Sequence, residues 1–440
     1  MFLLKIIILI LYVFVLIKKL LKKESTYLPF WILPLFMFVW KSLSLLYLEQ
    51  GVYATELYRE TYPLGTEYVF LALMTIFFAS SMFFIKTLDA SAEIDSQNMM
   101  ISSSNEKYID YFIHIHIFIL LYLYVNVFLT GIYFSGSVLT YIRNSRLPFV
   151  NTLGSTVSFL LLVVDGVSAF CLKKHRKKAF ILFGLSVLYM LIIGAKFSGI
   201  YQYVVFFIIP YVFNYALTKG IKIRDILKPK LVLPIVIFVC LILVYSVNVY
   251  SASGVTTNAS DLLVARLFNM QSGSLWGVNE YVREHNIELF GSSEQRSLEF
   301  EGLINNWSEL DERIGLGKVM YLITPYQIAY DYLSSGLRFS GWFLVVSILS
   351  FGYVGSAIFC IILGFIFGII CVALRKAMQR GDLFILAIAI FEYCHFYDYY
   401  RIGNFSILFN LISTVCLIVL MFYIFANKNK SQWKRKDAIK

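Results

Sequence analysis

Long apolar runs separated by short polar segments make up most of this chain. A bilayer core about 30 Å thick needs roughly 20 apolar helical residues, and lipid offers no partners to backbone N–H and C=O groups. We therefore predict membrane-spanning helices rather than strands. About eleven runs qualify: residues 2–17, 27–48, 68–85, 109–129, 155–171, 179–194, 200–217, 231–249, 353–374, 383–396 and 405–425.

One long polar segment interrupts this pattern and divides the chain. Residues 339–353, which follow it, are too few to cross the membrane and return, so we predict an outer interfacial or re-entrant segment there. The predicted regions are N-terminal spans one to eight in 1–249, a large external loop with short helices in 250–338, spans nine to eleven with the re-entrant segment in 339–425, and a basic tail in 426–440. We expect the loop to fold over the outer mouth of an all-α, polytopic membrane protein, because loops of this length are usually functional or disordered.

Composition supports a membrane protein. Hydrophobic residues make up 59% of the chain and charged residues only 15%, which excludes an ordinary soluble domain. The six cysteines lie in or beside apolar runs without metal-ligand spacing, so we interpret them as packing residues: Cys171, Cys240, Cys360, Cys371, Cys394 and Cys416.

The formal net charge of +11 follows mainly from topology. With the basic run 18–23 placed in the cytoplasm, strict alternation leaves 25 Lys and Arg in inner segments and 5 in short outer loops. This bias obeys the positive-inside rule and predicts a cytoplasmic C-terminus. Nucleic-acid binding is not needed to explain the charge.

The stretch "FEYCHFYDYYRIGNF", residues 391–405, places charged groups between two apolar runs. Helical geometry puts Glu392, His395 and Tyr399 on one face and pairs Asp398 with Arg401. An ionisable residue at membrane depth is a functional hypothesis by default. The structural alternative is that Asp398 and Arg401 only staple two helices at the outer interface, within a belt of tyrosines.

Two further segments bring cations to the predicted outer side. "GAKFSG", 194–199, holds Lys196 in a tight turn between two spans, and "RLFNMQSGSLWG", 266–277, carries Arg266 and Gln271. The alternative for both cations is an anchor in the lipid headgroups. His285 is more typical of a solvated loop, and Asp165 of a hydrogen bond between neighbouring helices.

Several motifs are absent from the sequence. It contains no GxxxxGK[ST], HExxH or GxSxG pattern and no convincing group of paired outer carboxylates. We therefore predict no metal site and no cofactor.

The span pattern, the long external loop, and the stretches "GAKFSG", "RLFNMQSGSLWG", "GLGKVMYLITP" (315–325) and "YDYYRIGN" resemble the Wzy-type O-antigen polymerases of bacterial inner membranes. The resemblance implies transfer of a growing glycan from undecaprenyl diphosphate to the non-reducing end of a lipid-linked repeat unit, on the periplasmic side. It also implies a fold related to metal-independent, GT-C-like membrane glycosyltransferases. The implied partners are undecaprenyl-diphosphate-linked oligosaccharide, membrane lipids and a chain-length regulator in the same membrane, with no nucleic acid.

The candidate residues suit such a transfer. A diphosphate leaving group needs fixed cations, and an acceptor hydroxyl needs a base. We predict catalytic roles for His395, Asp398 and Arg401, and substrate contacts from Arg266, Lys196, Gln271, Trp276, Tyr399, Glu392 and His285. His395, Asp398, Glu392 and His285 all remain candidates for the base.

Two other functions use similar architecture. A lipid-linked glycan ligase would use the same donor, and a flippase or transporter of lipid-linked oligosaccharide would also have many spans. The sequence shows no paired halves and no corresponding broken helices, which disfavours a transporter. The sugars and the linkage are not encoded in any pattern that we can read.

Overall fold

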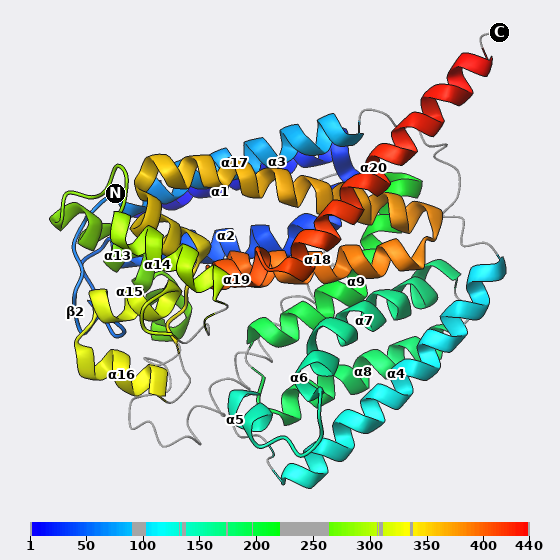
Figure 1. Ribbon diagram of the computed structural model, residues 1–440, viewed down its shortest axis with the longest axis horizontal. Helices are drawn as coiled ribbons and strands as arrows, with labels where there is room; N and C mark the ends of the chain where they lie inside the picture. Colours follow the sequence, from blue (N-terminus) through cyan, green and yellow to red (C-terminus); the bar gives the residue numbers. More distant parts are fainter. Residues whose placement is uncertain are drawn as a thin grey trace.

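A computed structural model describes residues 2–89, 103–131, 133, 138–172, 175–195, 197–220, 264–305, 307, 311–334 and 338–438, which are almost entirely helical (Figure 1). The α-helices are α1 (Phe2–Glu24), α2 (Leu28–Leu48), α3 (Thr66–Asp89), α4 (Ser103–Thr130), α5 (Val138–Arg143), α6 (Val150–Thr152), α7 (Ser158–Val167), α8 (Arg176–Ile192), α9 (Phe197–Lys219), α13 (Gly273–Glu284), α14 (Ser293–Ile304), α15 (Gly315–Ile323), α16 (Tyr326–Ser334), α17 (Phe343–Arg380), α18 (Leu383–Ile402), α19 (Phe405–Leu408) and α20 (Leu411–Ala438). The other elements are the 3₁₀ turn η1 (Ser25–Tyr27), the π-helical turns η2 (Leu153–Val157), η3 (Ser168–Leu172) and η4 (Ala265–Asn269), and an antiparallel hairpin of β1 (Tyr53–Ala54) and β2 (Arg59–Glu60).

The chain is a polytopic membrane protein, as the sequence predicts. Within the described residues, six helices are long and apolar enough to cross a membrane: Leu28–Leu48, Thr66–Asp89, Tyr108–Thr130, Val150–Cys171, Gly199–Lys219 and Phe343–Arg380. The predicted span 231–249 lies outside the described residues. The count of about eleven spans therefore stays a prediction.

The predicted re-entrant segment 339–353 differs in detail from the structure. Its residues from Phe343 onward form the buried first part of α17, which is interrupted at Gly352 (φ 65°, ψ −169°). The loop 288–292 satisfies the backbone at this break, because Tyr353 N donates to Glu288 O at 2.7 Å and Ser292 N donates to Leu349 O at 2.9 Å. The loop approaches so closely that a Cβ at Gly352 would lie 2.4 Å from its backbone.

The last two predicted spans also have different bounds. The span predicted at 383–396 continues as helix to Ile402, and the run 405–425 is divided into α19 and α20. Asn410 causes the second difference, since its side-chain oxygen accepts from Ser413 N at 2.8 Å and so begins a new helix.

Glycines set the closest helix crossings. A Cβ at Gly364 of α17 would lie 2.1 Å from Ser80 Oγ, and one at Gly368 would lie 3.0 Å from Phe84 Cβ, so α17 and α3 approach this closely because both positions lack a side chain. Gly166 has the same role between α7 and α9, where a Cβ would lie 2.3 Å from Phe207 O. Figure 1 shows one helix group containing α1, α2, α3, α17, α18 and α20 beside a second group of α4, α7, α8 and α9.

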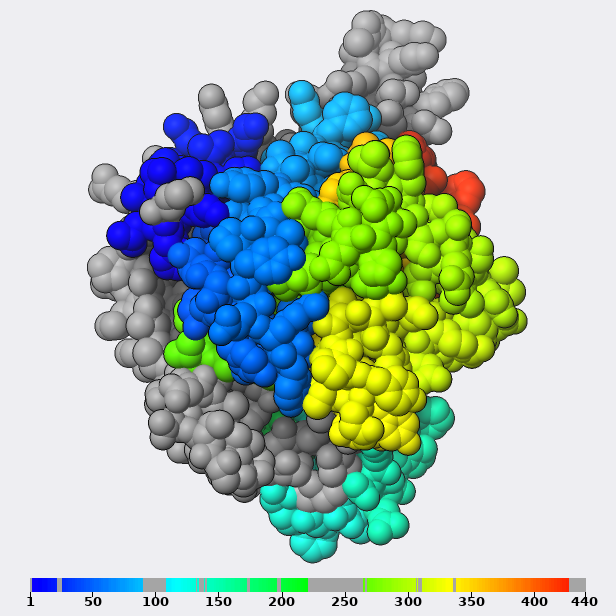
Figure 2. All heavy atoms as spheres, turned by 90° about the vertical axis from the view of Figure 1, so that its left-hand side faces the viewer, coloured from blue at the N-terminus to red at the C-terminus, as the bar shows by residue number. Residues whose placement is uncertain are grey.

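Helices α13–α16, which we call the cap, cover one end of the first group. Helices α13, α14 and α15 pack on α17, α16 packs on α15, and α13 also contacts α2 and α3. Figure 2 faces this end and shows the cap next to the segment that carries the hairpin. Glu49 at the end of α2 fixes that segment, since its carboxylate accepts from the backbone N–H groups of residues 64–66 at 2.6 to 2.8 Å.

Candidate functional site

The polar cluster of residues 391–405 lies on the last turns of α18, whose C-terminal end points toward the cap (Figure 1). The helix begins at Asp382, whose side chain accepts from Ile385 N at 3.2 Å. It ends at Gly403, where φ of 87° closes the last turn through a bond to Tyr399 O. These two caps set where α18 begins and ends, and therefore which polar side chains lie on its last turns.

Asp398 and Arg401 form the predicted pair. Arg401 Nη2 donates to Asp398 Oδ1 at 3.1 Å, and the two side chains are 43% and 35% exposed, respectively. Arg401 Nε is buried and has no hydrogen-bond partner within the described residues. The guanidinium therefore keeps a donor for a ligand while Asp398 restrains its position.

Glu392, His395 and Tyr399 do not act as one group, although they were predicted to share a face. Glu392 is fully buried and accepts from Ser413 Oγ of α20 at 2.6 Å. Tyr399 is also buried, within a cluster of phenylalanines that includes Phe405. His395 is half-buried, with Nδ1 2.9 Å from Phe391 O. Of the three, only His395 remains accessible beside Asp398.

The segment 266–277 lies along α2. Trp40 Nε1 donates to Leu267 O at 2.7 Å and Ser44 Oγ donates to Phe268 O at 2.6 Å, which fixes η4 and therefore the backbone of Arg266. The side chain of Arg266 and the whole of Lys196 lie outside the described residues, so their predicted roles stay predictions.

The remaining predicted substrate contacts are placed as follows. Gln271 Oε1 accepts from Ser340 Oγ at 3.0 Å. This bond joins the segment 266–277 to residues 338–342, which we call the approach to α17. Trp276 is fully buried inside the cap, and its Nε1 donates to Tyr62 O at 3.3 Å. His285 is exposed at the end of α13 and stacks on Tyr281 at 4.0 Å. Trp276 lies in α13 and His285 at its end, and α13 packs on α2, α3, α15 and α17.

Lys41 of α2 is the residue that the sequence analysis missed. It is 1% exposed, and its ammonium donates to Gln271 O, to Ser340 Oγ at 3.0 Å and to Gly341 O at 3.0 Å. A lysine inside an apolar span is a signal that could have found it.

The segment containing Ser340 and Gly341 in turn touches the end of α18. A Cβ at Gly341 would lie 2.9 Å from Ile402 O, and one at Gly403 would lie 2.9 Å from Trp342 O. We call the set that meets here the α18 junction: Lys41, Gln271, Ser340, Gly341 and Arg401. It joins α2, the segment 266–277, the approach to α17 and the exposed end of α18.

Buried acids hold the cap together outside the membrane helices. Burial raises the pKa of Glu299 to about 6, although its Oε1 accepts from Gly315 N at 2.6 Å and Gln295 Nε2 at 2.9 Å. Burial also raises the pKa of Glu280, which pairs with Arg59. These acids connect cap elements to each other and to the hairpin segment.

A second polar cluster lies in the other helix group. His116 Nδ1 is 2.7 Å from Asp165 Oδ2, and His116 Nε2 is 3.2 Å from Ser186 Oγ. The prediction that Asp165 hydrogen-bonds a neighbouring helix is confirmed. All three side chains are buried, so we call them the enclosed cluster.

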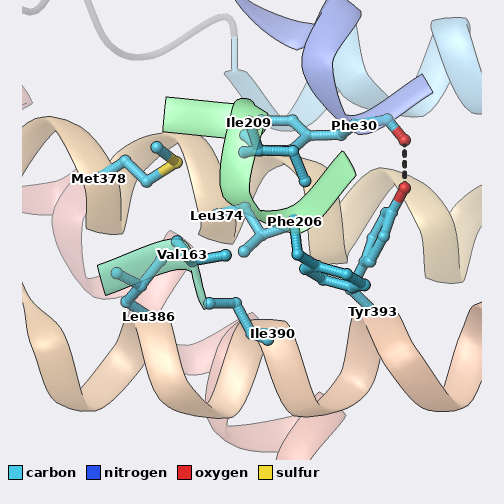
Figure 3. Close-up of a pocket in the computed structure, with 9 residues that line it drawn as sticks. All are labelled: Phe30, Val163, Phe206, Ile209, Leu374, Met378, Leu386, Ile390 and Tyr393. Atoms are coloured by element: carbon cyan, nitrogen blue, oxygen red, sulfur yellow. Dashed lines mark hydrogen bonds between the residues drawn. The ribbon is translucent and has the colours of Figure 1, made fainter. Parts of the chain in front are cut away.

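A small apolar pocket lies between the two helix groups (Figure 3). It contains about 230 Å³ of empty space and is lined by Phe30, Val163, Phe206, Ile209, Leu374, Met378, Leu386, Ile390 and Tyr393. The two oxygens drawn at its edge are bonded to each other, since Tyr393 Oη donates to Phe30 O at 2.7 Å. This pocket offers no donors or acceptors for a sugar. Within the described residues, no group of three or more His, Cys, Asp or Glu side chains could hold a metal ion.

Comparison with known proteins adds one finding. Residues 309–424 match DUF6418, a family of unknown function. This match includes α15–α19, and so contains Ser340, Gly341 and the end of α18, whereas Lys41 and Gln271 lie outside it. No curated protein and no solved structure matches the chain.

Proposed function

We propose that the protein is a membrane glycosyltransferase that polymerises lipid-linked oligosaccharide repeat units. It transfers a growing glycan from undecaprenyl diphosphate to the non-reducing end of the next repeat unit. In this proposal the chain lies in a bacterial inner membrane, with the cap and the end of α18 on the periplasmic side. The resemblance to Wzy-type polymerases and the positive-inside pattern support this assignment.

One observation carries the proposal. The Asp398–Arg401 pair is partly exposed at the end of a helix in the membrane bundle. The turn that carries it packs against Gly341, which accepts a hydrogen bond from the buried Lys41 and lies against Leu316 of the cap. Arg401 Nε and Trp342 Nε1 are buried donors without a partner within the described residues. Buried unsatisfied donors are rare, and here they suit an oxygen-rich ligand such as a diphosphate or a sugar.

The reaction needs two kinds of group. The acceptor hydroxyl oxygen bonds to the anomeric carbon as the bond from that carbon to the diphosphate oxygen breaks, and the bonding electrons leave with the diphosphate. Arg401 stabilises the charge that grows on this leaving group. The hydroxyl proton goes to His395 or to Asp398, the two accessible bases on the same turns. Glu392 suits this role less well, because it is buried against α20.

A strain without this protein tests the proposal. We expect its surface to carry a single repeat unit, because the remaining enzymes still export and attach the monomer. Lipid-linked polymer that is never attached would indicate a ligase instead. Repeat units retained on the cytoplasmic leaflet would indicate a flippase, and either result would overturn the proposal.

A further inference from the structure

Lys41 combines deep burial with a full set of partners. A charged side chain in a membrane helix is unfavourable unless protein groups replace its water, and such residues usually serve a function. All three acceptors of its ammonium come from outside α2, from Gln271, Ser340 and Gly341. The backbone of α2 also accepts a hydrogen bond from the segment 266–277, since Ser272 Oγ donates to Lys41 O at 3.0 Å.

Two neutral donors on the same helix provide a comparison. Trp40 and Ser44 bind the carbonyl groups of Leu267 and Phe268, which belong to the segment 266–277. Lys41 binds Gln271 O in that segment and also reaches the approach to α17. Through Lys41, α2 therefore holds two separate segments at one point.

The approach to α17 transmits this restraint to Arg401. Gly341 lies against Ile402 O and Gly403 lies against Trp342 O, and neither position has room for a β-carbon without movement. A displacement of this segment must therefore move the last turn of α18. Arg401 lies in that turn, so the position of its guanidinium depends on the approach to α17.

We propose that Lys41 is a positioning residue for the diphosphate site. Through Ser340 and Gly341, its ammonium fixes the turn that carries Arg401, so that the guanidinium is held in place to meet the leaving diphosphate. This inference rests on the proposed function and adds a residue to it. Lys41 does not touch the substrate, because it is 1% exposed.

The test measures kcat and KM for transfer by purified protein with an undecaprenyl-diphosphate-linked repeat unit. Replacing a charge-assisted donor typically changes a rate by about ten- to one-hundred-fold, so we expect Lys41→Met to lower kcat at least about tenfold. Lys41→Arg keeps the charge and should retain activity within about threefold. Trp40→Phe, which removes a neutral donor to the same segment, is the matched control and should stay within about twofold.

A second background separates positioning from simple structural support. If Lys41 acts through Arg401, the Lys41→Met change should lower kcat much less in an Arg401→Ala protein than in the wild type. Equal loss in both backgrounds would overturn the inference. If Lys41→Met does not fold, Ser340→Ala replaces it in this test, because it removes one acceptor of the ammonium. The decrease in kcat that Ser340→Ala causes should likewise disappear in the Arg401→Ala background.

The two proposals fail in different ways. Wild-type protein that transfers no glycan, or full activity of Arg401→Ala, contradicts the proposed function. Loss of activity in Arg401→Ala together with full activity in Lys41→Met contradicts only the role of Lys41.

Discussion

The α18 junction and the enclosed cluster both place ionisable side chains among apolar helices, but they differ in access. Arg401 of the junction and its partner Asp398 are 35% and 43% exposed, and Arg401 keeps an unpartnered donor within the described residues. His116 and Asp165 are 0% and 1% exposed, and both ring nitrogens of the histidine have partners. A polar cluster in a membrane protein indicates chemistry when a ligand can reach it, and helix packing when it is closed and satisfied.

The largest expected effect is the loss of transfer rate when the base beside Arg401 is removed. One of the two variants His395→Ala and Asp398→Asn should lower the transfer rate by about 10²- to 10⁴-fold, because a positioned base typically contributes that much. The other should have a clearly smaller effect. Rates would be measured with purified protein at equal concentration of folded molecules. Near-normal rates for both variants would exclude this turn of α18 from proton transfer.

The enclosed cluster should affect stability instead. His116→Ala leaves Asp165 buried without its partner, which we expect to cost about 3–5 kcal/mol of unfolding free energy. His114→Ala is the matched control, because His114 is exposed on the same helix two residues earlier and should change stability by less than about 0.5 kcal/mol. Thermal unfolding in detergent and protein level in membranes report the difference. A stable His116→Ala protein with a reduced transfer rate per molecule would mean that the two clusters are not distinct in role.

Glu299 should make the stability of the cap depend on pH. Burial raises its pKa to about 6 from the ordinary value of 4.5, so the neutral acid is favoured in the folded state. Its contribution is complete below about pH 4.5 and is lost as pH rises through 6, and the loss amounts to about 2 kcal/mol. Relative to Glu299→Gln, the wild-type unfolding temperature should therefore fall across this range. Parallel curves for the two proteins would contradict the assignment.

Reporter fusions test the membrane topology, and for them we expect no change in transfer rate or stability. A reporter fused after Lys178, Lys230 or Arg380 should lie in the cytoplasm, and one inserted near Gly291 should lie on the opposite side. The 25 to 5 distribution of Lys and Arg supports this orientation. A reporter after Lys178 that is active outside the cytoplasm would invert the proposed location of the junction.

The helices were predictable because lipid forces them to be long and apolar. Their exact ends were less so, since Asn410 begins a new helix where hydropathy runs on without a break. The break at Gly352 depends on a loop about 60 residues earlier in the chain, whose backbone pairs with it. Periodicity alone could not show that contact.

Within the candidate site, local spacing predicted local contacts only. Asp398 and Arg401 are three residues apart on a helix, so their pairing follows from helical geometry. The same geometry could not tell that Glu392 faces α20 or that Tyr399 faces a phenylalanine cluster. Lys41 was missed because its acceptors lie 230 to 300 residues away in sequence.

The central claim is that Arg401 binds the diphosphate of a lipid-linked glycan during transfer. The most direct measurement is the rate at which purified wild-type, Arg401→Lys and Arg401→Ala proteins extend an undecaprenyl-diphosphate-linked repeat unit, with the folded fraction determined for each. A charge-assisted contact of roughly 1.5–3 kcal/mol predicts a loss of about ten- to one-hundred-fold for Arg401→Ala and only partial rescue by Arg401→Lys. Folded Arg401→Ala protein that transfers glycan at the wild-type rate would contradict the claim and leave Arg401 with only its pairing to Asp398 on the same helix.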